Sequence, residues 1–174
     1  SRKVKMIGAD LFVDKIEKLG VEFFTGVPDS QLKPFTNEII SRYGVGEKNV
    51  IAANEGNAVG LASGYYIAKA KPACVYLQNS GLGNIFNPVT SLTNEDVYGI
   101  PVLYVVGWRG EPEIHDEPQH IFQGKITLQT LELLNIKAFV ISQDITTEKI
   151  ADIFDEISER FLNRQSSALV IKKG

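Results

Sequence analysis

Short apolar runs, separated by longer amphipathic stretches, dominate the hydrophobic pattern of the chain. Most of these runs lack the strict alternation of a strand with one wet face, and continuous runs are typical of strands buried on both sides. The pattern predicts six strands, at residues 22–26, 49–53, 73–78, 101–107, 137–141 and 167–172.

The intervening stretches carry a helical period. Towards the C-terminus, Ile150, Ile153 and Ile157 recur at helical spacing, with charged residues on the opposite face. Comparable stretches predict helices at residues 8–19, 31–43, 55–70, within 83–97, at 126–134 and at 145–161.

This alternation of strands and helices predicts an α/β fold, an open and mostly parallel six-stranded sheet with helices on both faces. The 174 residues fit one domain, because cores divide only beyond about 250 residues. A hydrophobic content of 44% and a charged content of 22% exclude a disordered or fibrous chain. The exceptional connection is 109–123, a polar, proline-containing loop long enough to indicate a functional segment.

Charge and composition narrow the possible partners. The balance of 18 Lys+Arg against 21 Asp+Glu gives a net charge of −3, so we expect no nucleic acid partner. The single cysteine, Cys74, lies within an apolar run and cannot form an internal disulfide, which favours a cytoplasmic location. No apolar run approaches the ~18 residues of a membrane span, so we expect no membrane partner.

Four polar segments follow predicted strands, where ligands bind in an open parallel sheet. They supply carboxylates, amides, hydroxyls and one arginine, at residues 26–30, 54–57, 78–84 and 107–112. The turn Gly81-Leu82-Gly83 lacks the third glycine of a dinucleotide fingerprint, and no phosphate-binding P-loop or serine hydrolase elbow occurs. His115 and His120 are five apart in a loop, a spacing more typical of surface residues than of a metal site, so we predict no metal ligands in this chain.

Glu55 is the strongest candidate for chemistry. It follows an apolar strand and opens a helix in which Gly56, Gly60 and Gly64 recur every four residues on one face. A glycine costs about 1 kcal/mol in a helix interior relative to alanine, so three in register indicate a close contact with a partner or a cofactor. The alternative is a carboxylate favoured only by the helix dipole, with glycines that serve internal packing.

These motifs resemble the pyrimidine-binding domain of thiamine diphosphate enzymes. The segment Asn54-Glu55-Gly56-Asn57-Ala58 is similar to the glutamate helix of that superfamily, and Gly26-Val27-Pro28-Asp29 is similar to its first βα turn. Narrower similarity, to the phosphonopyruvate decarboxylases, extends over nearly the whole chain. It is carried by the segments 26–30, 77–84, 87–88, 98–101, 107–112, 116–120 and 123–124.

The resemblance implies a role for each matching residue. The Glu55 carboxyl is implied to hydrogen-bond N1′ of the cofactor's aminopyrimidine and so to promote loss of the thiazolium C2 proton. Cofactor contacts are also implied for Val27, Pro28, Asn79 and Gly81, and Asp29 is expected to take part in proton handling.

The resemblance further implies a small, strongly anionic substrate, 3-phosphonopyruvate, which needs cations and hydrogen-bond donors. Arg109 is the one cation of the four polar segments, and we expect it to bind substrate oxygens together with Ser30, Ser80 and His120. The alternative for Arg109 is a solvated loop residue paired with Glu111.

No Gly-Asp-Gly motif for Mg²⁺ and diphosphate occurs in the 174 residues. We therefore interpret residues 1–174 as a single pyrimidine-binding domain. A diphosphate-binding domain, fused or on a separate subunit, and an oligomeric assembly would complete the thiamine diphosphate and Mg²⁺ site. Two alternatives are the α subunit of a sulfopyruvate decarboxylase and a non-catalytic binding domain of the same fold.

Overall fold

A single sheet forms the centre of the computed structural model, which describes residues 7–173. Its strands are β1 (Phe24–Gly26), β2 (Asn49–Ile51), β3 (Ala73–Gln78), β4 (Val102–Gly107), β5 (Lys137–Ile141) and β6 (Ser167–Ile171). They lie in the order β2-β1-β3-β4-β6-β5, and every adjacent pair is parallel. The predicted open six-stranded sheet is confirmed, with a fully parallel arrangement.

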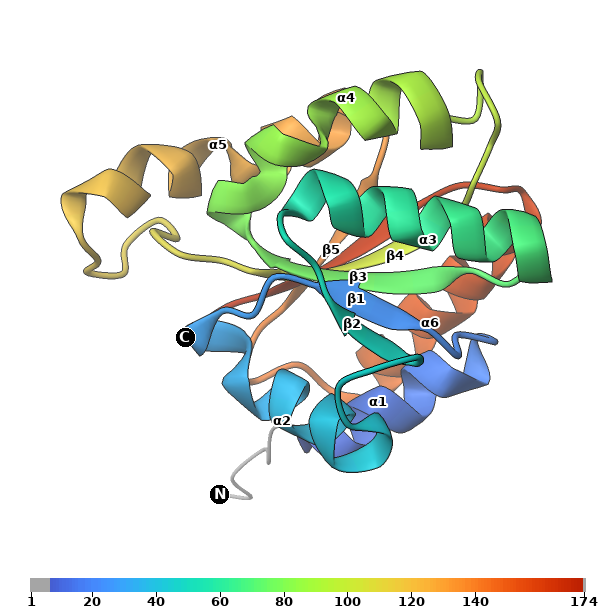
Figure 1. The fold of residues 1–174 in the computed structure, drawn as a ribbon. Coiled ribbons are helices and arrows are strands. Elements are labelled where there is room, and N and C mark those ends of the chain that lie inside the picture. The colour runs from blue at the N-terminus through green and yellow to red at the C-terminus, as the bar shows by residue number, and fades with distance from the viewer. Residues whose placement is uncertain (1–6, 174) are drawn as a thin grey trace.

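Helices cover both faces of this sheet, as the hydrophobic pattern predicts (Figure 1). One face carries α3 (Glu55–Lys69), α4 (Phe86–Pro88) and α5 (Pro118–Leu133). The other carries α1 (Ala9–Lys18), α2 (Lys33–Tyr43) and α6 (Thr147–Leu162). None of the helices in the described part of the chain is long and apolar enough to cross a membrane.

Strand β4 illustrates why its apolar run is continuous. Tyr104 and Val106 pack into the core beneath α3 and α5, whereas Leu103 and Val105 pack into the core beneath α1, α2 and α6. All six residues of the strand are buried. A strand with cores on both faces has no place for the polar residues that would create an alternating pattern.

Two connections differ from the expected elements. A 3₁₀ turn, η1 (Ser30–Leu32), precedes α2, and Asp29 caps this turn by accepting a hydrogen bond from the backbone N–H of Gln31. After β3 the chain forms three short helical pieces in place of one helix: the 3₁₀ segment η2 (Asn79–Ile85), α4, and the π-helical η3 (Val89–Thr93). Both irregular segments begin at the edge where the strands end.

Helix α5 begins eight residues before the predicted start at residue 126. Pro118 occupies its first turn, where the missing N–H of proline costs nothing. The polar loop is therefore shorter than predicted, and residues 118–123 belong to the helix. Gly110 and Gly124 bring loop and helix together, because a Cβ on Gly124 would lie 1.7 Å from the Gly110 carbonyl oxygen.

The glycines of α3 have different surroundings. A Cβ on Gly56 would lie 2.8 Å from the carbonyl oxygen of Asn84, whereas nothing lies within 4 Å of the Cβ positions of Gly60 and Gly64. These last two glycines are exposed. Internal packing therefore accounts for Gly56 alone, and a partner interface at Gly60 and Gly64 stays a prediction.

We expect Gly60→Ala to raise the free energy of unfolding by about 0.5–1 kcal/mol, because the site is open and alanine favours helix. In contrast, Gly26→Ala places a Cβ 2.0 Å from the Tyr76 carbonyl oxygen. Overpacking of this kind lowers stability by about 1–3 kcal/mol or more. Urea unfolding of the chain measures both changes, and a destabilising Gly60→Ala would contradict the open environment described for α3.

Candidate active site at the carboxyl edge of the sheet

The parallel strand order brings the four predicted polar segments to one edge of the sheet. Strand β1 lies between β2 and β3, and β4 is the next strand beyond β3. Since all are parallel, the residues that follow them converge at the carboxyl edge. Two groups of contacts form there, one around Glu55 and one around Asp29 and Arg109.

Glu55 is the first residue of α3, whose preceding residue Asn54 caps the helix by accepting a hydrogen bond from the backbone N–H of Asn57. Its Oε2 accepts a hydrogen bond of 2.8 Å from the side-chain amide of Asn84. No hydrogen bond to Oε1 occurs within the described part of the chain. The carboxyl group is thus oriented from one side, with one oxygen available to a ligand.

Gly81 makes room for this carboxyl group. A Cβ on Gly81 would lie 2.5 Å from Oε1 of Glu55 and 2.6 Å from its Cδ. Gly81 is itself buried at the start of the segment after β3. Any side chain there would displace the Glu55 carboxyl, so the two residues form one structural unit.

The environment of Glu55 is less apolar than its preceding run suggests. Strand β2 is an edge strand that ends at Ile51, and Ile51 and Ala53 are exposed. The expected apolar setting is therefore not formed by this chain alone. An edge strand has one open side, which leaves its last residues accessible.

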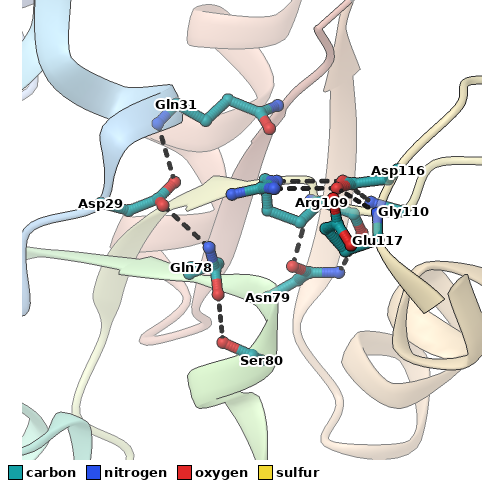
Figure 2. Close-up of polar contacts among 9 residues, drawn as sticks. All are labelled: Asp29, Gln31, Gln78, Asn79, Ser80, Arg109, Gly110, Asp116 and Glu117. Atoms are coloured by element: carbon teal, nitrogen blue, oxygen red, sulfur yellow. Dashed lines mark hydrogen bonds and ion pairs between the residues drawn. The ribbon is translucent and has the colours of Figure 1, made fainter. Parts of the chain in front are cut away.

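Asp29 is held by hydrogen bonds from both sides (Figure 2). Its Oδ1 accepts a 2.8 Å hydrogen bond from the amide of Gln78, and its Oδ2 accepts one of 3.2 Å from the backbone N–H of Gln31. The Ser80 hydroxyl donates to Oε1 of Gln78 at 2.5 Å, which fixes the orientation of that amide. Gly107 makes room here as Gly81 does for Glu55, because its Cβ would lie 2.5 Å from Asp29 Oδ2.

Arg109 forms a two-pronged ion pair with Asp116, seven residues further along the loop. Nε and Nη2 donate to the two carboxylate oxygens at 2.9 and 2.8 Å. Asp116 also accepts 2.8 Å hydrogen bonds from the backbone N–H groups of Gly110 and Glu117. These contacts, chiefly that with Arg109, hold the pKa of Asp116 well below its usual range.

The pKa of Arg109 is raised, first by its hydrogen bonds to Asp116 and further by the nearby charges of Asp29 and Glu117. Figure 2 shows the guanidinium between Asp116 on one side and Asp29 with Gln78 on the other. The alternative considered for Arg109, an ion pair with Glu111, does not form. The Glu111 carboxylate is buried and accepts a hydrogen bond from the backbone N–H of Lys173.

Asn79 is buried and contacts the backbone of Arg109. Its amide accepts a hydrogen bond from the Arg109 N–H and donates to the Arg109 carbonyl, at 3.1 and 2.8 Å. It also donates to the hydroxyl of Thr127 on α5. The side chain is fully engaged, and its expected cofactor contact is untested.

The other predicted residues surround the same edge. Val27 is anchored by a 3.1 Å hydrogen bond from its backbone N–H to the Tyr76 carbonyl, and Pro28 and Ser30 are exposed. His120 is half-buried in the first turn of α5, and its Nδ1 is buried without a hydrogen-bond partner in the described residues. Within residues 7–173 no three His, Cys, Asp or Glu side chains form a possible metal site.

Gln78 belongs to a predicted polar edge segment and Asp116 to a segment of the resemblance, but the sequence assigned a role to neither residue. Gln78 is polar and ends a buried strand, a signal that could have identified it as a site residue. The pairing of Asp116 with Arg109 could not be predicted, because it depends on the path of the loop. Gly110 and Glu113 have φ values of 67° and 72°, and these left-handed residues reverse the chain.

Comparison with known proteins assigns this chain to a family. The model described as "Thiamine pyrophosphate enzyme, N-terminal TPP binding domain" matches residues 6–133. A phosphonopyruvate decarboxylase from Streptomyces viridochromogenes is 37% identical over 149 residues, and one from Streptomyces hygroscopicus is 32% identical over 160 residues. These alignments cover 86% and 92% of this chain but only 36% and 38% of the relatives.

A sulfopyruvate decarboxylase subunit alpha from Methanococcus maripaludis is 30% identical over 152 residues, which are 87% of this chain and 86% of the relative. The chain thus spans a little over a third of the phosphonopyruvate decarboxylases and most of this subunit. All three relatives are decarboxylases by name. The chain belongs to the thiamine pyrophosphate enzymes, as their N-terminal TPP-binding domain.

Proposed function

We propose that this chain forms the pyrimidine-activating half of a thiamine diphosphate-dependent decarboxylase that converts 3-phosphonopyruvate to phosphonoacetaldehyde and CO₂. The observation that carries the proposal is the Glu55 carboxyl at the start of α3. It lies in space left by Gly81, with one oxygen held by Asn84 and the other available. The two phosphonopyruvate decarboxylases among the relatives support the choice of substrate.

The residues at this edge fit the pyrimidine end of the cofactor. Thiamine diphosphate, when bound, supplies the electron sink for loss of CO₂ from a 2-oxo acid. The Glu55 Oε1 is free to hold a proton at N1′ of the ring, while the Asn84 amide keeps the carboxyl oriented. In this proposal Mg²⁺ and the diphosphate are held by a second domain or subunit.

The second group of contacts serves the substrate. Arg109 supplies the positive charge, and the Ser30 and His120 side chains lie at the same edge as donors for phosphonate or carboxylate oxygens. The Ser80 hydroxyl, which donates to Gln78, serves the substrate by exchanging that partner for a substrate oxygen. Asp29 is held in place by Gln78 and the Gln31 N–H, which suits a group that exchanges a proton with the substrate.

A second candidate substrate is sulfopyruvate, which carries a sulfonate in place of the phosphonate. One observation favours it: the chain aligns with 86% of the length of a sulfopyruvate decarboxylase subunit alpha. In that case the same residues act in the same roles, and a separate subunit supplies the diphosphate site. A non-catalytic domain is less compatible with a carboxyl group fitted against a buried glycine.

Turnover tests the proposal. With the diphosphate-binding partner, thiamine diphosphate and Mg²⁺ present, we expect CO₂ release from phosphonopyruvate. Glu55→Gln should lower this rate by roughly 100-fold or more, because the amide does not exchange a proton with the ring. Glu47→Gln, at an exposed loop position, is the control. A preference for sulfopyruvate would replace the substrate assignment, and turnover of neither would refute the proposed function.

The space beneath Glu55 can be tested directly. Gly81→Ala places a methyl group 2.5 Å from Glu55 Oε1, so we expect a loss of activity similar to that of Glu55→Gln. Gly83→Ala is the matched control two residues away, because nothing lies within 4 Å of its Cβ position. Equal activities of the two alanine variants would contradict the described contact.

A further inference from the structure

The loop carboxylate Asp116 has no role in the function described so far, although it accepts four hydrogen bonds in the described residues, against two for Asp29 and one for Glu55. Its side chain is 10% exposed, and that of its partner Arg109 is 24% exposed. Two guanidinium nitrogens and two backbone N–H groups all donate to this one carboxylate. Such convergence fixes the carboxylate in a single orientation.

The contacts of Asp116 leave one end of Arg109 free. Nε and Nη2 bind Asp116, and Nη1 makes no hydrogen bond in the described part of the chain. Asn79 fixes the Arg109 backbone from the other side by accepting from its N–H and donating to its carbonyl. The Arg109 side chain is thus held both at its backbone and at its guanidinium group. The conformational entropy of this long side chain is therefore already lost before a ligand binds.

The direction of the free end matters. Figure 2 shows the guanidinium extending from Asp116 towards Asp29, which is proposed to exchange a proton with the substrate, and towards Gln78, which holds Asp29. Besides Asp116, the negative charges that act on Arg109 and raise its pKa are those of Asp29 and Glu117. An ion pair with Asp29 would occupy the cation that the substrate needs.

We propose that Asp116 is a positioning residue that sets substrate affinity by holding Arg109 with Nη1 directed into the site and away from a pair with Asp29. This inference rests on the proposed function. It adds a residue that touches no substrate and acts entirely through the arginine.

The variant Asp116→Asn tests this role, because asparagine has nearly the same shape but no charge. Its single oxygen can accept from the N–H of Gly110 or of Glu117 but not from both, since these groups donate to different oxygens of Asp116. For the enzyme assembled with its diphosphate-binding partner, thiamine diphosphate and Mg²⁺, we expect the KM for phosphonopyruvate to rise roughly tenfold or more, as for loss of a hydrogen bond to a charged group. The kcat should change far less. Glu117→Gln is the control, since it removes an equal charge near Arg109 and its carboxylate makes no hydrogen bond in the described residues.

The double variant with Arg109→Ala separates positioning from a structural role. If Asp116 acts through Arg109, Asp116→Asn has almost no further effect on KM once the arginine is gone. A KM increase that persists in the Arg109→Ala background would overturn the inference. Asp116 would then act by maintaining the structure of the loop and α5, and not through Arg109. A KM that falls in Asp116→Asn would also overturn it, since Asp116 would then merely oppose the substrate's charge.

The wild-type enzyme distinguishes this inference from the proposed function. Turnover of phosphonopyruvate without the expected coupling refutes the role of Asp116 alone. If the enzyme acts only on sulfopyruvate, the substrate assignment fails. The KM values of the same single and double variants, measured with sulfopyruvate, then decide the role of Asp116. Turnover of neither substrate overturns both.

Discussion

Two carboxyl groups of this domain occupy space that a side chain would fill if either of two glycines were replaced, one at the end of β4 and one in the segment after β3. Glu55 lies over Gly81 and Asp29 lies over Gly107, and in both cases a Cβ would come within 2.5 Å of a carboxyl oxygen. Glycine at these two positions lets polar groups approach the ends of β3 and β4 closely. The site depends on this constraint, because the parallel sheet brings the strand ends together and the glycines admit the reactive groups.

The remaining polar groups then have restricted positions. Gln78 bridges Ser80 and Asp29, Asn79 joins the Arg109 backbone to α5, and Asp116 binds the Arg109 head. Asn79 and Asp116 are each held by a neighbour that is not itself expected to touch the substrate, namely Thr127 and the backbone N–H of Gly110. Preorganisation of this kind lowers the cost of ordering a site during binding and catalysis. The edge strand β2, in contrast, leaves its last residues accessible beside Glu55.

The sequence predicts the centre of this fold better than its periphery. The bounds of β3 and β5 agree with their apolar runs, whereas β2 ends two residues early, because apolar Ala52 and Ala53 lie beyond the pairing of an edge strand. The start of α5 escaped prediction because its first turns mix polar residues with Gly124, whose close approach to Gly110 is a tertiary contact. Similarly, the sequence identified Glu55 and Gly81 as separate site residues but did not predict their contact. That contact and the Arg109–Asp116 ion pair depend on backbone turns, which the hydrophobic periodicity of a sequence does not predict.

The central claim is that the Glu55 carboxyl acts on the pyrimidine ring of thiamine diphosphate. Exchange of the C2 proton of the bound cofactor for deuterium tests it most directly, because this step needs no substrate and is independent of the phosphonate assignment. The account predicts rapid exchange in the wild-type assembly and exchange slower by roughly 100-fold or more in Glu55→Gln at full cofactor occupancy. Equal exchange rates in the two proteins would contradict it.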